Sequence, residues 1–251
     1  MYENLLFSQA DGIARITLHR PAVLNALSPG MIAELRDAVS KVAQDDSVKV
    51  LVVTGTGRAW SAGVDLKALN ESIQGGHFSN FEVMEMGKAF IETLQAMPQV
   101  TIAQVNGHCY TGATELMLAF DLVYAAHEAQ IGDTHAKWGI APKWGMTQRL
   151  AQKVGLMKAM ELSFTTLPVS GQEAERIGLV NKAVPLAELE STVNQVAERI
   201  KGNSAQTIAA MKQLYYYGAH QGLAQGLQHE WQADFKITDR EEFLRNFEKN
   251  K

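Results

Sequence analysis

The chain has 251 residues, of which 46% are hydrophobic and 20% are charged, and its formal net charge is −4 at pH 7. This composition excludes a disordered or collagen-like chain and suffices for one large domain, or one domain with an appendage, around a buried core. Because no basic cluster is present, we expect neither nucleic acid nor an anionic membrane as a partner.

Strands alternate with helices over the first half of the chain. The segment 5–18 alternates around Asp11 and Gly12, a dipeptide that favours a tight hairpin turn. The apolar runs 48–54 and 100–105 are typical of strands covered on both faces. In chain order we expect a strand hairpin within 5–18, a helix near 29–44, a strand at 48–54, a helix near 81–97, a strand at 100–105, a helix near 113–120 and a strand at 122–125. This alternation predicts an α/β core with parallel strands joined by crossovers.

Beyond Pro185 the pattern changes to helices with no strand between them. They are expected at 186–201, 204–217, 223–235 and 240–249. Seven aromatic residues in the last three of these segments offer more apolar surface than a small bundle can bury. We therefore predict a core domain at 1–195 and a helical oligomerisation region at 196–251.

The cysteine content and the first residues bear on the compartment. Cys109, the single cysteine, cannot form an internal disulfide, which indicates a reducing environment. The start of the chain resembles neither a secretory signal nor a transit peptide. The most apolar window, 100–126, contains several charged and polar residues and so cannot span a bilayer. We expect a cytoplasmic protein.

Glu115 is an unusual charged residue. It precedes the run 116–120, which is apolar on all sides of the expected helix and leaves no solvated face for the carboxylate. Carboxylates in such places are typical of active sites. The alternative is that Glu115 lies in the first helical turn, where its charge favours the helix dipole. The residues alone leave both interpretations open.

Two loops, at 61–66 and 110–113, each follow an apolar strand and lead into a helix. Each could present free backbone N–H groups at the positive end of that helix, and two such groups converging on one point would form an oxyanion hole. Each loop taken separately also fits an ordinary strand-to-helix turn.

Three weaker motifs give little support to other chemistries. The segment 55–60 begins like a dinucleotide-binding turn but places Trp60 where the third glycine belongs, which disfavours a nicotinamide enzyme. Asp133 and His135 lack the spacing of a metal site, so no metal is expected. Ser61 stands one residue short of a nucleophile elbow, which leaves a serine hydrolase as a minor hypothesis.

Three blocks together resemble the crotonase superfamily, the enoyl-CoA hydratase/isomerase family. RPAVLNAL at 20–27 resembles the family's early segment, WSAGVDL at 60–66 resembles its A-G-x-D-[LI] loop, and NGHCYTGATEL at 106–116 resembles its N-G-x-x-x-G-G-G-x-E-L block. Further similarity at 139–142, 145–150 and 174–180 extends the resemblance over nearly the whole chain.

This resemblance implies a spiral of ββα turns followed by a C-terminal all-helical trimerisation region. It also implies a homotrimer, or a hexamer built as a dimer of trimers, that acts on an acyl-CoA thioester. The implied reaction adds water to a 2-enoyl-CoA, or removes it from a 3-hydroxyacyl-CoA, through a thioester enolate. No cofactor is implied, since coenzyme A is part of the substrate.

Matched residue by residue, the resemblance also implies roles. The backbone N–H groups of Val64 and Gly112 would hold the thioester oxygen, and Glu115 would be the first catalytic carboxylate. Coenzyme A would be bound by Leu24, Ala62, Asp65 and Leu66, with Lys249 at the end of the tail meeting a phosphate.

The sequence departs from the family pattern in two places. The glycine run before Glu115 is reduced to Thr-Gly-Ala at 111–113, and the second catalytic glutamate is replaced by His135. Histidine works as a general acid or base near neutral pH, so water addition by Glu115 and His135 is the main hypothesis. Double-bond isomerisation or decarboxylation by the same pair stays open. So does a non-catalytic acyl-CoA-binding or assembly protein.

Overall fold

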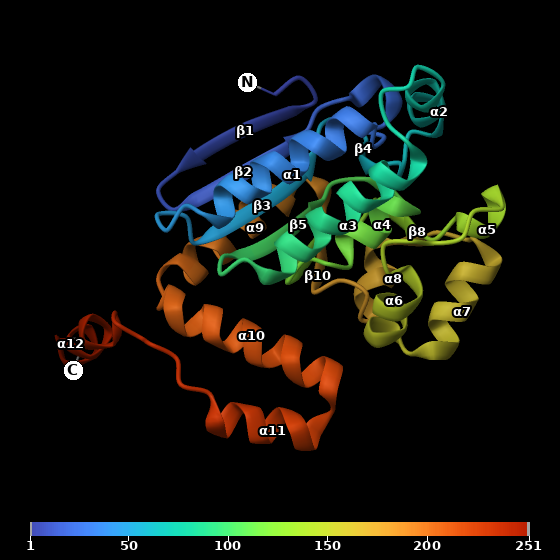
Figure 1. Cartoon of the computed structure of the whole chain (residues 1–251). Helices are drawn as coiled ribbons and strands as arrows, with labels where there is room; N and C mark the ends of the chain where they lie inside the picture. The colour runs from blue at the N-terminus through green and yellow to red at the C-terminus, as the bar shows by residue number, and fades with distance from the viewer. Residues whose placement is uncertain (1, 250–251) are drawn as a thin grey trace.

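The computed structural model describes residues 2–249, which form two sheets with helices around them (Figure 1). The larger sheet has the strand order β1-β2-β3-β5-β7-β10, and the smaller has the order β4-β6-β8-β9. The strands are β1 (Leu5–Ala10), β2 (Ile13–Leu18), β3 (Val50–Gly55), β4 (Ala59–Ser61), β5 (Val100–Val105), β6 (His108–Tyr110), β7 (Leu122–Ala126), β8 (Gln130–Gly132), β9 (Val169–Ser170) and β10 (Lys182–Val184).

The chain winds as a spiral between the two sheets. Strands β3, β5 and β7 lie side by side in the larger sheet, and each is followed by a short strand, β4, β6 or β8, in the smaller sheet. Pairing is parallel from β2 to β10 and from β4 to β8, whereas β1 with β2 and β8 with β9 are antiparallel. The predicted α/β spiral of ββα turns is therefore confirmed.

Local sequence explains several element boundaries. The hairpin between β1 and β2 turns at Asp11 and Gly12, with φ of 49° and 76°, as predicted. Ser79 and Glu82 form a capping box at the start of α3 (Asn80–Ala96).

The helices are α1 (Pro29–Ala43), α2 (Leu66–Gln74), α3 (Asn80–Ala96), α4 (Gly112–Met117), α5 (His135–Trp138), α6 (Met146–Val154), α7 (Leu156–Thr165), α8 (Gly171–Arg176), α9 (Leu186–Lys201), α10 (Ala205–Gln221), α11 (Leu223–Gln232) and α12 (Arg240–Lys249), with a 3-10 turn at Pro21–Val23.

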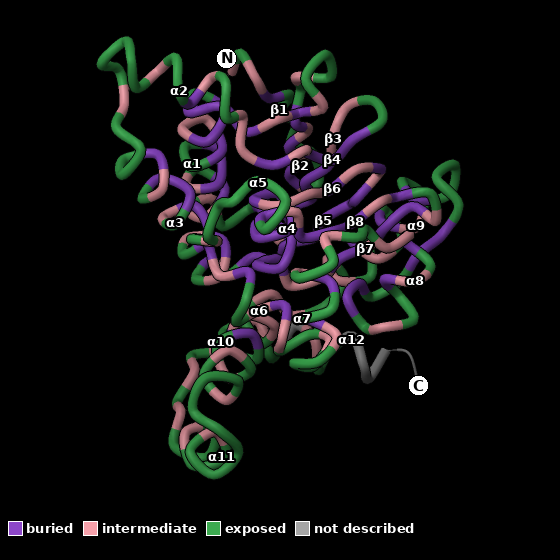
Figure 2. The backbone as a smooth tube through the Cα atoms, turned by 90° about the vertical axis from the view of Figure 1, so that its right-hand side faces the viewer, coloured by how far each residue is buried: buried purple, intermediate pink, exposed green. Residues whose placement is uncertain are grey.

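The core lies between the larger sheet and its covering helices. Strands β3 and β5 are almost wholly buried, and Figure 2 shows them inside a shell of partly exposed helices. Helices α1 and α3 pack against each other on one face of the sheet, and α9 packs against the strands from the other (Figure 1). One expectation was too long, because the helix predicted at 113–120 ends at Met117.

The C-terminal helices stand apart from this body. The antiparallel pair α10 and α11 projects away from the sheets and is mostly exposed (Figures 1 and 2). The buried Lys212 of α10 attaches the pair to the core through an ion pair of 2.8 Å with Asp121. The division expected after residue 195 falls inside α9, which packs on the sheet, so the projecting part begins at Ala205. The division into domains stays a prediction.

In the part of the chain that the structure describes, the helices are either too short or too polar to cross a membrane.

Candidate active site

A cavity of about 680 Å³ lies at the carboxyl ends of β4, β6 and β8, the parallel strands of the smaller sheet. Ligands of open α/β sheets bind at such an edge, because the loops that follow neighbouring strands meet there. Seven of the residues expected in the site line this cavity, namely Ala62, Val64, Asp65, Leu66, Gly112, Glu115 and His135. Three loops, distant in sequence, therefore supply one site.

The two remaining expected residues are placed differently. Among the described residues that line the cavity, Leu24 is absent and its neighbours Val23 and Ala26 are present. Leu24 has a left-handed backbone with φ of 55°, and its carbonyl accepts a hydrogen bond from the N–H of Ala62 at 3.0 Å. Leu24 thus fixes the loop that lines the cavity. The side chain of Lys249 lies outside the described part of the structure.

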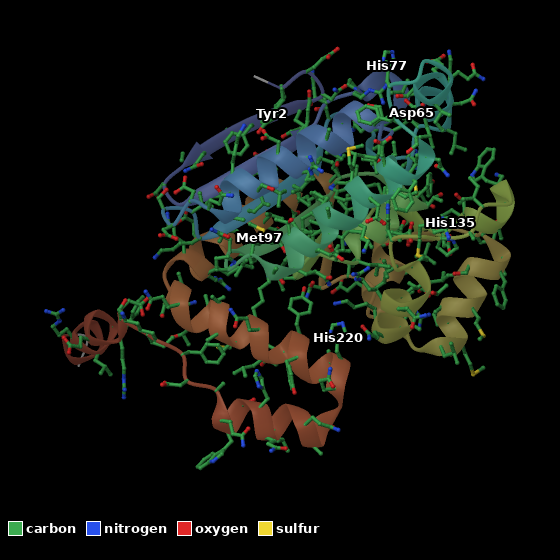
Figure 3. All side chains as sticks on the ribbon, viewed as in Figure 1. Tyr2, Asp65, His77, Met97, His135 and His220 are labelled. Atoms are coloured by element: carbon green, nitrogen blue, oxygen red, sulfur yellow. The ribbon has the colours of Figure 1, made fainter. Side chains whose placement is uncertain are left out.

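Asp65 uses its carboxylate to hold the first loop. One oxygen caps α2 by accepting the N–H of Ala68 at 3.0 Å, and the other pairs with Arg20 at 2.9 Å. This fixes the start of α2 at the mouth of the cavity, where Leu66 is half exposed. His77, beyond the far end of α2, lies well away from His135 (Figure 3).

The two glycine-containing loops touch each other. A Cβ atom on Gly63 would lie 2.8 Å from the carbonyl oxygen of Tyr110, and one on Gly112 would lie 3.2 Å from Cγ2 of Val64. Among the described residues, the N–H groups of Val64 and Gly112 find no hydrogen-bond partner. Gly112 begins α4, so its N–H points out of the positive end of that helix. Two free backbone donors therefore lie on adjoining loops at the cavity.

Thr111, which precedes Gly112, has an unusual backbone. Its φ of 54° and ψ of −119° are costly for a β-branched residue. A hydrogen bond between the hydroxyls of Thr111 and Thr134 secures it. The strained turn brings the N–H of Gly112 to the cavity and joins this loop to the one that carries His135.

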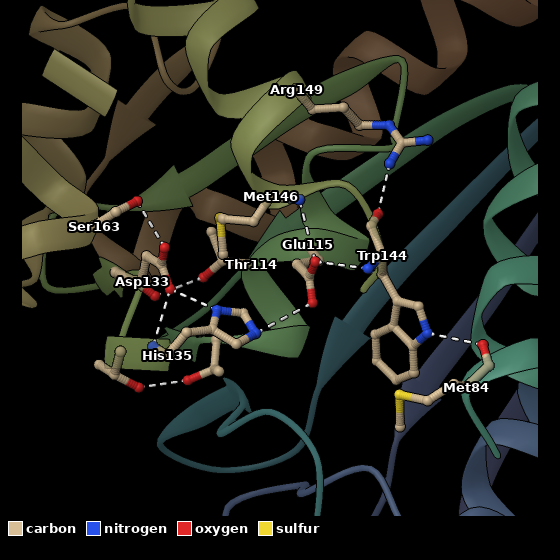
Figure 4. A network of polar contacts seen from close by, with 12 residues as sticks. Met84, Thr114, Glu115, Asp133, His135, Trp144, Met146, Arg149 and Ser163 are labelled. Atoms are coloured by element: carbon tan, nitrogen blue, oxygen red, sulfur yellow. Dashed lines mark hydrogen bonds and ion pairs between the residues drawn. The ribbon is translucent and has the colours of Figure 1, made fainter. Parts of the chain in front are cut away.

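Glu115 is buried in the first turn of α4, with 2% of its surface exposed. Its Oε1 atom accepts hydrogen bonds from the backbone N–H groups of Trp144 at 2.8 Å and Met146 at 3.1 Å. Its Oε2 atom lies 3.5 Å from Nε2 of His135 (Figure 4). One oxygen therefore anchors the side chain, and the other faces the histidine.

His135 is held between two carboxylates. Its Nδ1 atom lies 2.6 Å from Oδ1 of Asp133, which also accepts the backbone N–H of His135 at 3.0 Å. The other oxygen of Asp133 accepts the hydroxyl of Ser163 on α7 at 2.7 Å. The four side chains that contact one another in this row are Glu115, His135, Asp133 and Ser163, and all are buried or partly buried.

These contacts control the ionisation of the histidine. Burial by itself lowers the pKa of His135, but the hydrogen bonds and charges of Asp133 and Glu115 more than offset this and raise it to about 9. Burial raises the pKa of Asp133, yet hydrogen bonds from His135 and Ser163 prevail and leave that pKa below its usual value. At neutral pH the ring of His135 is thus an imidazolium.

Trp144 forms a rigid wall of the cavity. Its indole N–H donates to the carbonyl of Met84 at 2.9 Å, and the ring fills the space beside Gly87, where a Cβ atom would lie only 2.2 Å away. The same residue holds Glu115 through its backbone N–H. Sequence reasoning missed Trp144, because only the folded chain brings it between α3 and α4.

The structure contradicts the hypothesis of a nucleophilic serine. Ser61 is fully buried, and its hydroxyl accepts the N–H of Gly63 at 3.2 Å. Cys109 is no better placed, since burial raises its pKa to about 12 and keeps it a thiol.

Comparison with known proteins adds a relationship to this geometry. The sequence model of the enoyl-CoA hydratase/isomerase family matches residues 8–249. The probable peroxisomal enoyl-CoA hydratase 1 of Arabidopsis thaliana is 33% identical over 227 residues, which cover 90% of this chain and 83% of the relative. The crotonyl-CoA hydratase of Syntrophomonas wolfei is 35% identical over 79% of this chain and 76% of its own. A crystal structure of enoyl-CoA hydratase from Bacillus anthracis superimposes with a TM-score of 0.89 and 31% identity, covering 99% of this chain and 97% of that one.

Proposed function

Because the chain belongs to the enoyl-CoA hydratase/isomerase family, we propose that it adds water to a 2-enoyl-CoA, or removes water from a 3-hydroxyacyl-CoA. The observation that carries this proposal is the pairing of Glu115 with His135 at 3.5 Å on the cavity wall. The pair lies beside two unpartnered backbone N–H groups, so a bound thioester meets a base, an acid and an oxyanion hole together. The enzyme is a hydro-lyase that acts on acyl-CoA thioesters.

The N–H groups of Val64 and Gly112 bind the thioester oxygen. When a nucleophile attacks carbon 3 of the enoyl group, the electron pair of the double bond moves toward the carbonyl and places negative charge on this oxygen. Two fixed donors stabilise that charge more than they stabilise the neutral carbonyl, which lowers the barrier.

The proton transfers divide between the two side chains. The Oε2 atom of Glu115 takes a proton from water as the water oxygen bonds to carbon 3. His135 gives the proton on Nε2 to carbon 2, so the enolate collapses to the 3-hydroxyacyl thioester. Glu115 is then protonated and His135 neutral, and transfer of that proton across 3.5 Å restores both groups. The sum of these steps is the addition of one water molecule.

Coenzyme A is the carrier part of the substrate and approaches over the first loop. Ala62, Asp65 and Leu66 line the cavity on this side, and Leu24 holds the loop in place. Lys143 also lines the cavity and offers a positive charge to the anionic carrier. No additional cofactor takes part in this proposal.

Assembly is part of the proposal. The projecting helices expose large apolar side chains, including Tyr215, Leu223, Leu227 and Trp231. Such a surface favours contact with other copies, so we propose a homotrimer, or a hexamer formed from two trimers. Light scattering should give three or six times the chain mass, and a monomer would contradict the proposal. The cytoplasmic location stays a prediction, and the Arabidopsis relative is named peroxisomal.

A substrate screen tests the reaction. Purified protein is incubated with crotonyl-CoA and longer 2-enoyl-CoA thioesters, and loss of the conjugated thioester absorbance is followed together with the hydroxyacyl product. The same screen includes 3-enoyl-CoA and malonyl-type thioesters. Conversion of a 3-enoyl-CoA without water addition would indicate an isomerase. Calorimetric binding of acyl-CoA without turnover of any thioester would indicate a non-catalytic protein.

A further inference from the structure

Within the tripeptide 133–135, the carboxylate of Asp133 clamps the proposed acid, His135. Oδ1 of Asp133 accepts both the ring Nδ1–H and the backbone N–H of His135, at 2.6 and 3.0 Å. A spacing of two residues makes this double contact possible, because the carboxylate reaches forward over the start of α5. The clamp fixes both the position and the orientation of the imidazole ring.

Ser163 fixes the carboxylate in turn. Its hydroxyl donates to Oδ2 of Asp133 at 2.7 Å, and it reaches across from the last turn of α7. With 4% of its surface exposed, Asp133 is shielded from water, and it is not among the described residues that line the cavity. Any influence of Asp133 on the substrate therefore passes through His135.

The contact determines which nitrogen exchanges protons. With Nδ1–H donated to Asp133, the other nitrogen, Nε2, faces Oε2 of Glu115 and the cavity (Figure 4). Asp133 accepts the Nδ1–H whether or not Nε2 carries a proton. The same atom can thus give a proton to the substrate and receive one from Glu115, with no rotation or change of tautomer.

We propose that Asp133, braced by Ser163, is a positioning residue that fixes the imidazole ring of His135 and aims its Nε2–H at the substrate. This inference rests on the proposed function of His135 as the acid. The charged side chains around the imidazole ring agree with this role. Asp133 hydrogen bonds to the ring and Oε2 of Glu115 lies 3.5 Å from its Nε2, while Lys137 of α5 lies over the exposed Trp138. Two further side chains in this region are positively charged. Lys143 lines the cavity, and Arg149 donates a hydrogen bond to the carbonyl of Trp144.

The proposal predicts a shift in the pH profile. His135 acts as an acid while protonated, so wild-type kcat should fall only as pH rises through about 9. In Asp133→Asn the ring loses one of its two anionic partners, and the alkaline limb should move by at least one pH unit toward the ordinary histidine value of about 6.5. At pH 8 the smaller protonated fraction should lower kcat by about 2-fold for a shift of one pH unit and by about 30-fold for a full return to the ordinary value, with KM nearly unchanged.

A second variant guards against misfolding. Ser163→Ala leaves Asp133 in place and should shift the limb in the same direction by a smaller amount. Asp37→Asn, which changes an exposed carboxylate paired with Lys41, is the matched control and should leave the profile unchanged. Circular dichroism and calorimetric binding of CoA report whether each variant is folded.

A spectroscopic measurement separates this inference from the proposed function. Nitrogen NMR of histidine-labelled protein, with the His135 signals assigned by their loss in His135→Gln, gives the protonation of each ring nitrogen independently of turnover. We expect Nδ1 to stay protonated throughout and Nε2 to titrate near pH 9 in the wild type. Titration at the ordinary value, or an unshifted alkaline limb in folded Asp133→Asn, would overturn the proposal. Absence of hydratase activity with an intact NMR signature would instead refute the proposed function.

Discussion

The carboxylate of Glu115 has one oxygen fixed by the backbone and one oxygen, Oε2, directed at Nε2 of His135 across 3.5 Å. The fixed oxygen accepts two N–H groups, so the side chain has little freedom to turn. The directed oxygen is open to the cavity and can accept a proton. Oε1 therefore holds the side chain in place, and Oε2 is the oxygen that is expected to act as the base.

Glu115→Gln should abolish the base while leaving the binding site intact. The amide oxygen of glutamine can still accept the N–H groups of Trp144 and Met146, so the local structure should survive. We expect kcat for crotonyl-CoA to fall by about 10²- to 10⁴-fold, with CoA thioester affinity nearly unchanged. Steady-state kinetics and calorimetry measure the two effects. Glu92→Gln, on the exposed side of α3, is the control; wild-type hydration by Glu115→Gln would refute the assignment.

The stability of the protein should depend on pH through His135. Its pKa rises from about 6.5 in the unfolded chain to about 9 in the folded one. The stabilisation is therefore fully present below pH 6.5 and is lost as pH rises through 9. The shift corresponds to roughly 3 kcal/mol. Urea unfolding at pH 6.5 and pH 9.5 measures it.

His135→Gln is the reference for that measurement. Removing the titrating ring should remove the part of the pH dependence that lies between 6.5 and 9, while other groups keep theirs. If the free energy of unfolding changed equally with pH in the wild type and in His135→Gln, the raised pKa of His135 would be contradicted.

Gly87→Ala should disturb the site from α3. The added Cβ atom would lie 2.2 Å from the indole of Trp144, which has no room to retreat because it is buried and bonded to Met84. We expect a loss of about 1–3 kcal/mol in the free energy of unfolding, typical of overpacking, and a reduced kcat because Trp144 also holds Glu115. Denaturant unfolding and kinetics test both. The control is Gly30→Ala in α1, where an added Cβ atom would make only ordinary van der Waals contacts at 3.7 Å or more, so no loss of stability is expected. An equally stable Gly87→Ala would contradict the close packing of Trp144 on α3.

Asn25 should be essential for the first loop. It is fully buried, its amide donates to the carbonyls of Thr56 and Ala59, and its oxygen accepts the N–H of Arg20. Its φ is 54°, which few residue types adopt readily. Asn25→Ala loses three hydrogen bonds and retains the strain, so the free energy of unfolding should fall by about 3 kcal/mol or more.

Asn25→Gly separates these two contributions. Glycine accepts a positive φ without strain, so only the loss of hydrogen bonds remains. Thermal unfolding should rank the wild type first, Asn25→Gly second and Asn25→Ala last. A reversed order of the two variants would show that backbone conformation is unimportant at this position.

Much of the fold and site could be predicted because the informative residues lie close together in sequence. The hairpin followed from Asp11 and Gly12, and the buried strands followed from their apolar runs. Residues 61–66 and 110–115 each form one continuous segment, so a local motif carried several cavity residues at once. The residues around Glu115 left a buried carboxylate and a place in the first helical turn as alternatives, and both hold in the structure.

The remaining parts depend on how distant segments pack. Ser163 meets Asp133 only because α7 lies beside α5, and no local pattern records that contact. Trp144 is positioned by Gly87, which is far from it in the chain. The spacing of Asp133 and His135 was visible in the sequence and did not support a metal site, but it gave no indication of the contact with Ser163. The helix predicted to reach residue 120 ends earlier, at Met117, because a tight turn then leads into β7.

Each turn of the spiral delivers a separate part of the site. The segment after β4 carries the N–H of Val64, the segment after β6 carries Gly112 and Glu115 in the first turn of α4, and the segment after β8 carries His135 at the start of α5. The hydroxyl contact between Thr111 and Thr134 joins the last two of these segments, so replacing His135 while keeping Thr134 would change the proposed acid and leave that contact in place. The spiral thus keeps the proposed proton donor on a different segment from the proposed oxyanion donors, so the two functions can be altered one at a time.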